Sequence, residues 1–157
     1  MQTPDEHLSI PYKRIPNARL WPELQALQEA AAGAATTAYA PYSHFRVGAA
    51  LQLSSGQIVV GSNQENAAYP SGLCAERTAL FAAGAQYPGE TVQTLLLLAV
   101  GPDGERVREI TPCGACRQVM QEVSARQGTS FRVVLCGAQE SILIEDNRLL
   151  LPFAFSL

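Results

Sequence analysis

Three cysteines and one glutamate form the pattern with the clearest chemistry in this sequence. Cys74 and Glu76 are two residues apart, and Cys113 and Cys116 follow in a Pro-Cys-x-x-Cys segment. A structural zinc site is closed by four protein ligands, whereas a catalytic zinc takes three and leaves the fourth position for water. The sequence supplies three well-placed cysteines and no obvious fourth ligand. The pattern therefore predicts a zinc site of the catalytic kind.

Both cysteine clusters stand at the starts of predicted helices, 74–86 and 113–127. Free N–H groups and the positive end of the helix dipole stabilise thiolate, which is the form that binds metal. Cys113 and Cys116 are three residues apart, so one helical turn can present both to one ion. Cys74 comes from the other helix. We therefore expect the metal to join two helix N-termini.

Two charged residues, Glu76 and Arg77, stand just after Cys74. Glu76 is close to the metal without sharing the helical face of Cys74, which suits a proton carrier better than a fourth ligand. It could take a proton from zinc-bound water and deliver it to a leaving group. Arg77 is either a cation that donates to thiolate sulfur or a surface ion-pair residue. The remaining cysteine, Cys136, lies in a β-rich run and is interpreted as a core residue.

Composition narrows the function classes. The chain has 157 residues, 47% hydrophobic and 16% charged, which fits one globular domain. A net charge of −3 disfavours a nucleic-acid partner. The longest apolar run, 95–100, is far shorter than the roughly 20 residues that span a bilayer, and the N-terminus lacks the regions of a signal peptide. We expect a cytoplasmic protein with neither a membrane nor a nucleic-acid partner.

Hydrophobic periodicity predicts alternating helices and strands. The expected helices are 21–38, 74–86 and 113–127, with a short turn at 148–151, and the expected strands are 45–53, 57–62, 93–100, 131–136 and 141–145. This order predicts a three-layer α/β/α domain over 21–157 with a mixed sheet of about five strands. Residues 1–20 hold three prolines and are expected to form an extended or mobile arm.

With these residues in place, the chain resembles the small cytidine deaminases that act on free nucleosides, within the zinc-dependent cytidine/deoxycytidylate deaminase superfamily. The Cys-x-Glu and Pro-Cys-x-x-Cys signature carries the resemblance first. Three other segments are similar to the family's first strand, its substrate loop and its C-terminal element: 40–50, 63–73 and 150–155. The resemblance covers roughly residues 22–156, which is nearly the whole expected domain.

The resemblance implies the reaction and the metal centre. Cys74, Cys113 and Cys116 would hold one Zn²⁺ per chain, Glu76 would be the proton shuttle, and Arg77 would stand beside the thiolates. The implied reaction is hydrolytic deamination of cytidine and 2′-deoxycytidine to the uridines, with release of ammonia, as in pyrimidine salvage. The family commonly forms homotetramers whose sites borrow loops from neighbouring subunits.

The resemblance also implies contacts with the substrate, at Phe45, Asn63, Glu65, Tyr69, Ala75 and Phe155. Asn63 and Glu65 would hydrogen-bond a ribose hydroxyl, because an amide and a carboxylate together answer its donor and its acceptors. Phe45 would pack on the pyrimidine. Tyr69 and Phe155 would help to build a site at a subunit interface. Taken singly, Asn63 could also be a turn residue and Phe45 a core residue.

Three features depart from the family's usual pattern. The segment before Trp21 is longer than in compact members, the chain ends two residues after Phe155, and Ser62 stands where some relatives carry cysteine. None of these changes affects the metal ligands or Glu76.

Several other functions remain open at this point. One is deamination of another aminopyrimidine such as blasticidin S, and a less favoured one is editing of RNA or DNA. A non-catalytic zinc site would need a fourth ligand, for which His44 is the sole histidine within the expected domain. A Cys-x-x-Cys redox module would leave Cys74 and Glu76 without a role.

Overall fold

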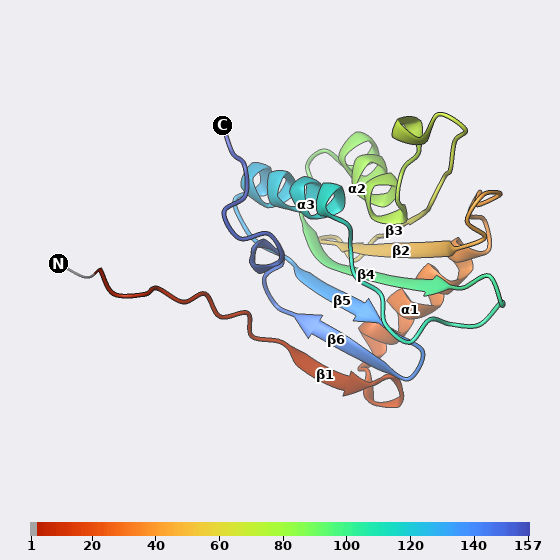
Figure 1. The fold of residues 1–157 in the computed structure, drawn as a ribbon, viewed down its shortest axis with the longest axis horizontal. Helices are drawn as coiled ribbons and strands as arrows, with labels where there is room; N and C mark the ends of the chain where they lie inside the picture. The colour runs from red at the N-terminus through yellow and green to blue at the C-terminus, as the bar shows by residue number, and fades with distance from the viewer. Residues whose placement is uncertain (1–2) are drawn as a thin grey trace.

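The computed structural model describes residues 3–157 and arranges them in three layers around one mixed sheet (Figure 1). Helix α1 (Pro22–Ala35) covers one face of the sheet, and helices α2 (Ala75–Gln86) and α3 (Gly114–Gln127) cover the other. The predicted α/β/α architecture is therefore confirmed.

The sheet has the strand order β1-β6-β5-β4-β2-β3. Its strands are β1 (Lys13–Pro16), β2 (Arg46–Leu53), β3 (Ile58–Ser62), β4 (Val92–Val100), β5 (Arg132–Cys136) and β6 (Glu140–Ile144). Short 3-10 turns lie at Asn17–Arg19, Tyr69–Ser71 and Asn147–Leu150. Within residues 3–157 the sheet has six strands, one more than expected. The additional strand is β1, which pairs antiparallel with β6 at the sheet edge.

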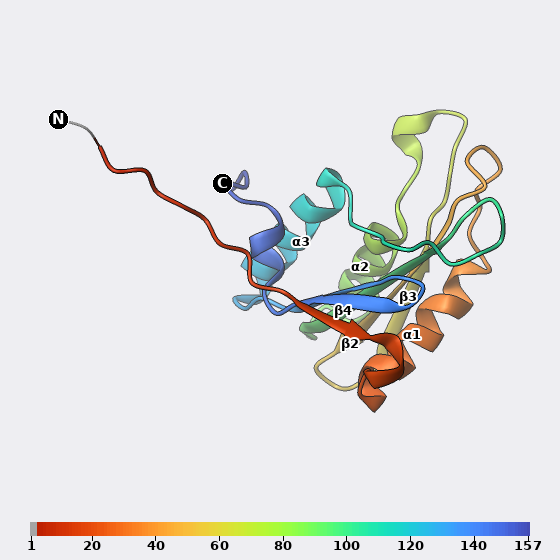
Figure 2. The same cartoon turned by 60° about the horizontal axis from the view of Figure 1, so that its bottom comes forward.

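Strand β1 lies inside the segment expected to be an arm. It has only four residues, and Pro16 ends it, which an edge strand tolerates because its outer N–H groups need no partner. Residues 3–12 before it form no helix or strand and extend away from the body of the molecule (Figures 1 and 2). The C-terminal part of the expected arm is thus attached to the sheet through β1.

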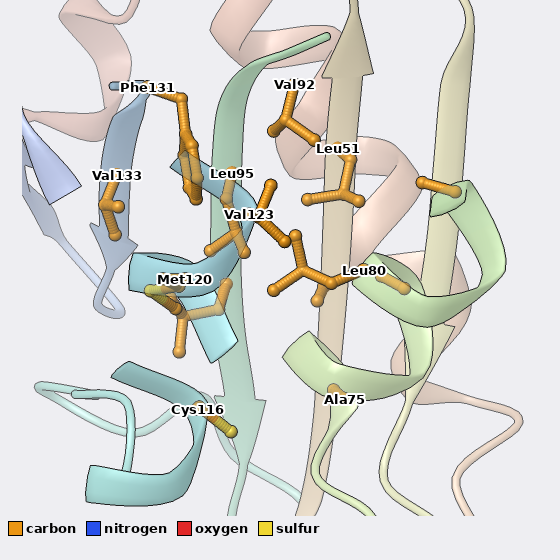
Figure 3. Close-up of a cluster of buried hydrophobic side chains, with 14 of the residues drawn as sticks. Leu51, Ala75, Leu80, Val92, Leu95, Cys116, Met120, Val123, Phe131 and Val133 are labelled. Atoms are coloured by element: carbon orange, nitrogen blue, oxygen red, sulfur yellow. The ribbon is translucent and has the colours of Figure 1, made fainter. Parts of the chain in front are cut away.

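Strand β4 shows why the centre of the sheet is a continuous apolar run. Leu95 and Leu97 face α2 and α3, whereas Leu96 and Leu98 face α1, and all four are fully buried. Alternate side chains of a strand point to opposite faces, so a strand covered on both sides is apolar at every position. Figure 3 shows the core on the α2 and α3 side, with Ala75 and Cys116 at one end of it.

The topology brings the starts of α2 and α3 to one edge of the sheet. Strand β2 is antiparallel to both β3 and β4, so β3 and β4 run in the same direction, and β5 is parallel to β4. Because β3 leads into α2 and β4 leads into α3, both helices begin beyond the carboxyl ends of like-directed strands. This edge is where open α/β sheets usually bind ligands.

Gly61 of β3 allows α2 to approach the sheet. A Cβ atom at this position would lie 2.5 Å from the backbone nitrogen of Ala79 and 2.6 Å from the carbonyl oxygen of Ala75. Both atoms belong to the α2 backbone, which cannot move aside as a flexible side chain would. Gly61→Ala should therefore displace α2 and lower Tm by about 5–10 °C in a thermal unfolding experiment.

Gly33 of α1 provides the matched control. A Cβ atom there would meet nothing within 4 Å, so Gly33→Ala should leave Tm unchanged or raise it, because alanine favours a helix interior by about 0.5–1 kcal/mol. Equal Tm values for the two variants would contradict the proposed contact between β3 and α2.

Candidate metal centre and active site

The three cysteine thiols meet at one point between α2 and α3. The Sγ atoms of Cys74 and Cys113 are 3.7 Å apart, those of Cys113 and Cys116 are 3.5 Å apart, and all three lie within 4.8 Å of one another. Zinc–sulfur bonds of about 2.3 Å in a tetrahedron place sulfurs about 3.8 Å apart. The cluster therefore fits one zinc ion. Within residues 3–157, His44 and every other histidine, aspartate and glutamate lie outside this cluster.

Hydrogen bonds fix the two segments that carry the cysteines, the one before α2 and the one before α3. Cys74 and Cys113 are the N-cap residues of α2 and α3, and Cys116 lies in the first turn of α3. Just before Cys74, the backbones of Gln64 and Leu73 exchange two hydrogen bonds of 2.9 and 3.0 Å. These bonds close the loop 64–73 at its base and set the position from which Cys74 enters α2.

The second loop is held by Arg117, a residue that the sequence did not single out. Its Nε donates to the carbonyl oxygen of Pro112 at 2.9 Å, and its Nη1 donates to that of Leu150 at 3.0 Å. The loop before Cys113 is thereby tied to the C-terminal turn of the chain. A spacing of four residues from Cys113 was the only sequence signal for this contact.

Arg77 lies on the metal cluster rather than in a surface ion pair. Its Nη2 is 3.6 Å from the Sγ of Cys74. The pKa of Cys74 is lowered to about 5, first by the hydrogen bond with the Cys116 thiol and then by Arg77. Cys74 is therefore a thiolate at neutral pH and ready to bind a cation.

In the zinc-free protein, iodoacetamide should alkylate Cys74 at about pH 6, where a thiol with an ordinary pKa near 9 hardly reacts. Because the pKa of Cys74 is lowered to about 5, its thiolate forms as the pH rises through that value. Peptide mass spectrometry across pH 4–9 would follow the rate. Arg77→Gln should move the rise to higher pH, and bound zinc should protect the thiol. A rate that rises only near pH 9 would contradict this assignment.

Glu76 lies in the first turn of α2, two residues after Cys74, and is only 3% exposed. Burial, which penalises the charged form, and to a lesser extent the Cys74 thiolate raise its pKa to about 7, against the opposing effects of a backbone hydrogen bond, the Cys116 thiol and Arg77. A carboxyl group with a pKa near 7 can both accept and donate a proton at neutral pH. The arrangement is thus suited to moving a proton next to the metal.

A pocket of about 520 Å³ opens beside Cys74. This volume suits a small organic ligand. The pocket lies between the segment around Tyr42 and the loop 63–73. The rings of Tyr42 and Tyr69, one from each segment, pack edge to face with their centroids 6.1 Å apart. Five predicted site residues line it, namely Asn63, Glu65, Tyr69, Cys74 and Arg77. The other six do not: Phe45, Ala75, Glu76, Cys113, Cys116 and Phe155.

Asn63 and Glu65 also organise the chain beside this pocket. The Asn63 side chain accepts a hydrogen bond from Val47 N at 2.8 Å and donates to Phe45 O at 2.9 Å. Glu65 accepts hydrogen bonds from the backbone N–H groups of Tyr42 and Ser43. Both side chains therefore position the segment 42–47, whatever they bind in the pocket.

Three predicted substrate contacts lie in different surroundings. Ala75 is fully buried in the core, backbone and side chain together, so its contact with a ligand stays a prediction. Tyr69 and Phe155 are 77% and 71% exposed, and the Phe155 carbonyl oxygen accepts a hydrogen bond from Gln118. The contribution of the two exposed rings to a subunit interface stays a prediction. Cys136 is buried against α1, as expected for a core residue. None of the helices described for residues 3–157 is long and apolar enough to cross a membrane.

Comparisons with known proteins agree with this geometry. Residues 22–130 match the family described as the cytidine and deoxycytidylate deaminase zinc-binding region. The chain is 39% identical over 132 residues to the cytidine deaminase of Halalkalibacterium halodurans, which covers 84% of this chain and 93% of that protein. It is 40% identical over 134 residues to a probable cytidine deaminase of Dictyostelium discoideum, covering 85% and 84% of the two chains.

Solved structures give the same picture. The crystal structure of cytidine deaminase from Burkholderia pseudomallei superposes with a TM-score of 0.70 at 46% identity, covering 83% of this chain and 98% of that one. The cytidine deaminase of Mycobacterium tuberculosis superposes with a TM-score of 0.64 at 32% identity, covering 85% and 98%.

Proposed function

This chain belongs to the family of zinc-dependent cytidine deaminases, and from that premise we propose that it hydrolyses both cytidine and 2′-deoxycytidine to the corresponding uridines and ammonia. The observation that carries the proposal is the cluster of three thiols within 4.8 Å of one another, with buried Glu76 next to it and a pocket beside Cys74. The chain thus supplies metal ligands, a proton carrier and a space for a nucleoside at one edge of the sheet.

Cys74, Cys113 and Cys116 would hold the zinc ion, which supplies a water molecule of lowered pKa as the nucleophile. Glu76 takes the proton of the attacking water and transfers it to N3 of the pyrimidine ring, while the water oxygen bonds to C4. Glu76 then takes the remaining proton of the C4 hydroxyl group and delivers it to the amino group; the C4–N bond breaks, the C4 carbonyl forms, and ammonia leaves. In the metal-free protein, burial raises the pKa of Glu76 to about 7, and a carboxyl group of this kind is suited to both accepting and donating a proton.

We assign recognition of the nucleoside to the neighbouring loops. Asn63 and Glu65 line the pocket and would hydrogen-bond a ribose hydroxyl. Phe45 does not line it, and its ring would have to turn toward the pocket to pack on the base. The pocket offers a carboxylate rather than free cations, because Arg77 is engaged with Cys74. This lining suits an uncharged sugar better than a phosphate track.

The assembly and the cellular role are also part of the proposal. Exposed aromatic rings at Tyr69, Phe153 and Phe155 would be covered in a homotetramer whose subunits complete one another's sites. Sedimentation as a single species near the 16.8 kDa of one chain would contradict this assembly. Conversion of a free nucleoside to its uridine form fits pyrimidine salvage in the cytoplasm.

The first experiment follows the loss of cytidine's ultraviolet absorbance on addition of purified protein, with zinc measured on the same sample. We expect turnover of cytidine and 2′-deoxycytidine with about one zinc per chain, and its loss on chelation. A folded, zinc-loaded protein that is inert toward both nucleosides would refute the substrate assignment. Turnover of blasticidin S alone, or a gel shift with single-stranded oligonucleotide, would identify the competing functions.

A further inference from the structure

The hydroxyl group of Ser43 joins the two residues proposed to hold the two halves of the nucleoside. Its Oγ donates a hydrogen bond to Oε1 of Glu65 and accepts a hydrogen bond from the backbone N–H of Phe45 at 3.0 Å. A serine hydroxyl has one donor and two acceptor positions, so both of its functions are used here. Ser43 also lines the pocket beside Cys74.

These contacts restrict what Glu65 can offer to a ligand. Its Oε2 accepts hydrogen bonds from Tyr42 N at 2.9 Å and Ser43 N at 3.3 Å, while its Oε1 accepts from Ser43 Oγ. A carboxylate has about four acceptor positions, so about one remains, on Oε1. The Ser43 hydroxyl and then the Tyr42 N–H lower the pKa of Glu65, which therefore stays an ionised acceptor.

The same contacts fix the backbone of Phe45. Ser43 holds its N–H group, and Asn63 holds its carbonyl oxygen at 2.9 Å. Between Ser43 and Phe45, the backbone of His44 has φ 55°, a left-handed conformation that is uncommon for residues other than glycine and needs its neighbours to hold it. Losing the Ser43 hydroxyl would remove the bond to Oε1 of Glu65 and the bond to the N–H of Phe45, while the two backbone bonds to Oε2 of Glu65 would remain.

We infer that Ser43 is a positioning residue for the substrate, a role that rests on the function proposed above. Its hydroxyl directs the one free acceptor of Glu65 toward a sugar hydroxyl and sets the distance between that acceptor and the ring of Phe45. Ser43 touches neither the metal cluster nor Glu76, so it acts on binding of the nucleoside and not on the chemical step.

Ser43→Ala should raise the KM for cytidine about 10-fold while changing kcat by less than about 3-fold, because hydrogen bonds to charged groups contribute that much to binding. Ser43→Thr keeps a hydroxyl and should restore KM to within about 3-fold of the original. An unchanged KM in Ser43→Ala, or an equal fall in kcat, would overturn the inference.

A nucleoside without ring hydroxyls separates the effect on Glu65 from a general loosening of the loop. The inhibition constant of 2′,3′-dideoxycytidine against cytidine should change less than about 2-fold between the original enzyme and Ser43→Ala, because Glu65 then has no 2′- or 3′-hydroxyl group to meet. An increase equal to that of the KM for cytidine would show that Ser43 acts on the base alone, and would overturn its action through Glu65.

Ser54→Ala is the matched control. Ser54 Oγ donates to Oε2 of Glu90 at 2.7 Å and accepts from Thr91 N at 3.2 Å, the same bonding pattern at a hairpin away from the pocket. It should alter Tm about as much as Ser43→Ala and leave KM unchanged; an equal rise in KM would overturn the inference. An original enzyme that does not deaminate cytidine would refute the proposed function itself, whereas active enzyme with an unchanged Ser43→Ala would refute only the role of Ser43.

Discussion

Glu76→Gln should lower the kcat for cytidine by about 10²–10⁴-fold and leave zinc at about one ion per chain. Glutamine has the size of glutamate but cannot accept and release a proton, so both proposed transfers would be lost. Glu76 is not among the three clustered cysteines that would bind zinc, so the variant should keep the metal. The measurement is the loss of cytidine's absorbance together with zinc analysis of the same preparation.

Glu122→Gln is the control for this substitution. Glu122 is an exposed carboxylate on α3, and its replacement should change neither kcat nor zinc content. Near-normal turnover in Glu76→Gln would refute the proton-carrying role. Loss of zinc in that variant would instead show that Glu76 belongs to the metal's own ligand set.

Glu76→Gln should also change the stability of the zinc-free protein. The pKa of buried Glu76 is raised to about 7 from an ordinary 4.5, so the folded state favours the protonated form. Its stabilising contribution is complete below about pH 4.5 and is lost as the pH rises through about 7. Glutamine cannot lose a proton, so the zinc-free variant should exceed the original protein in stability by about 3 kcal/mol above pH 7 and match it at low pH. Urea unfolding at several pH values would measure this difference.

Elements with a strong local signal could be predicted from the sequence. The apolar spacing of the three helices, the continuous run in β4 and the position of cysteines at two helix starts all follow from periodicity and helix-end chemistry. The family's signature then places Glu76 next to the metal. In each of these cases, the information lies within about one element of the chain.

Contacts that join distant segments were beyond sequence reasoning. Strand β1 has four residues, and its strand character comes from pairing with β6, more than 120 residues later. The bonds from Glu65 to Ser43 and from Arg117 to Leu150 exist because the sheet and the helices bring separate loops together. No local pattern marks Ser43 as different from other polar loop residues, and for Arg117 of α3 the spacing from Cys113 is the only signal.

Cys113→Ala should weaken zinc binding more than about 100-fold and abolish turnover of cytidine, because replacing even a residue that only supports a metal ligand costs about 10–100-fold. Cys113 is the informative choice among the three ligands. Its side chain is exposed at the start of α3, so its removal leaves no cavity, whereas Cys116 is fully buried. A loss of stability in Cys113→Ala would therefore report the loss of the metal that is proposed to join α2 to α3.

Cys136→Ala tests whether loss of any buried thiol has the same effect. Cys136 is fully buried on the α1 side of the sheet and lies outside the metal cluster. Its replacement should lower Tm modestly through lost packing while zinc stays at about one per chain and turnover is retained. Metal analysis and thermal unfolding of both variants, with and without added zinc, would separate the two effects. Stoichiometric zinc in Cys113→Ala would show that two thiolates and water suffice, and the three-cysteine assignment would then be wrong.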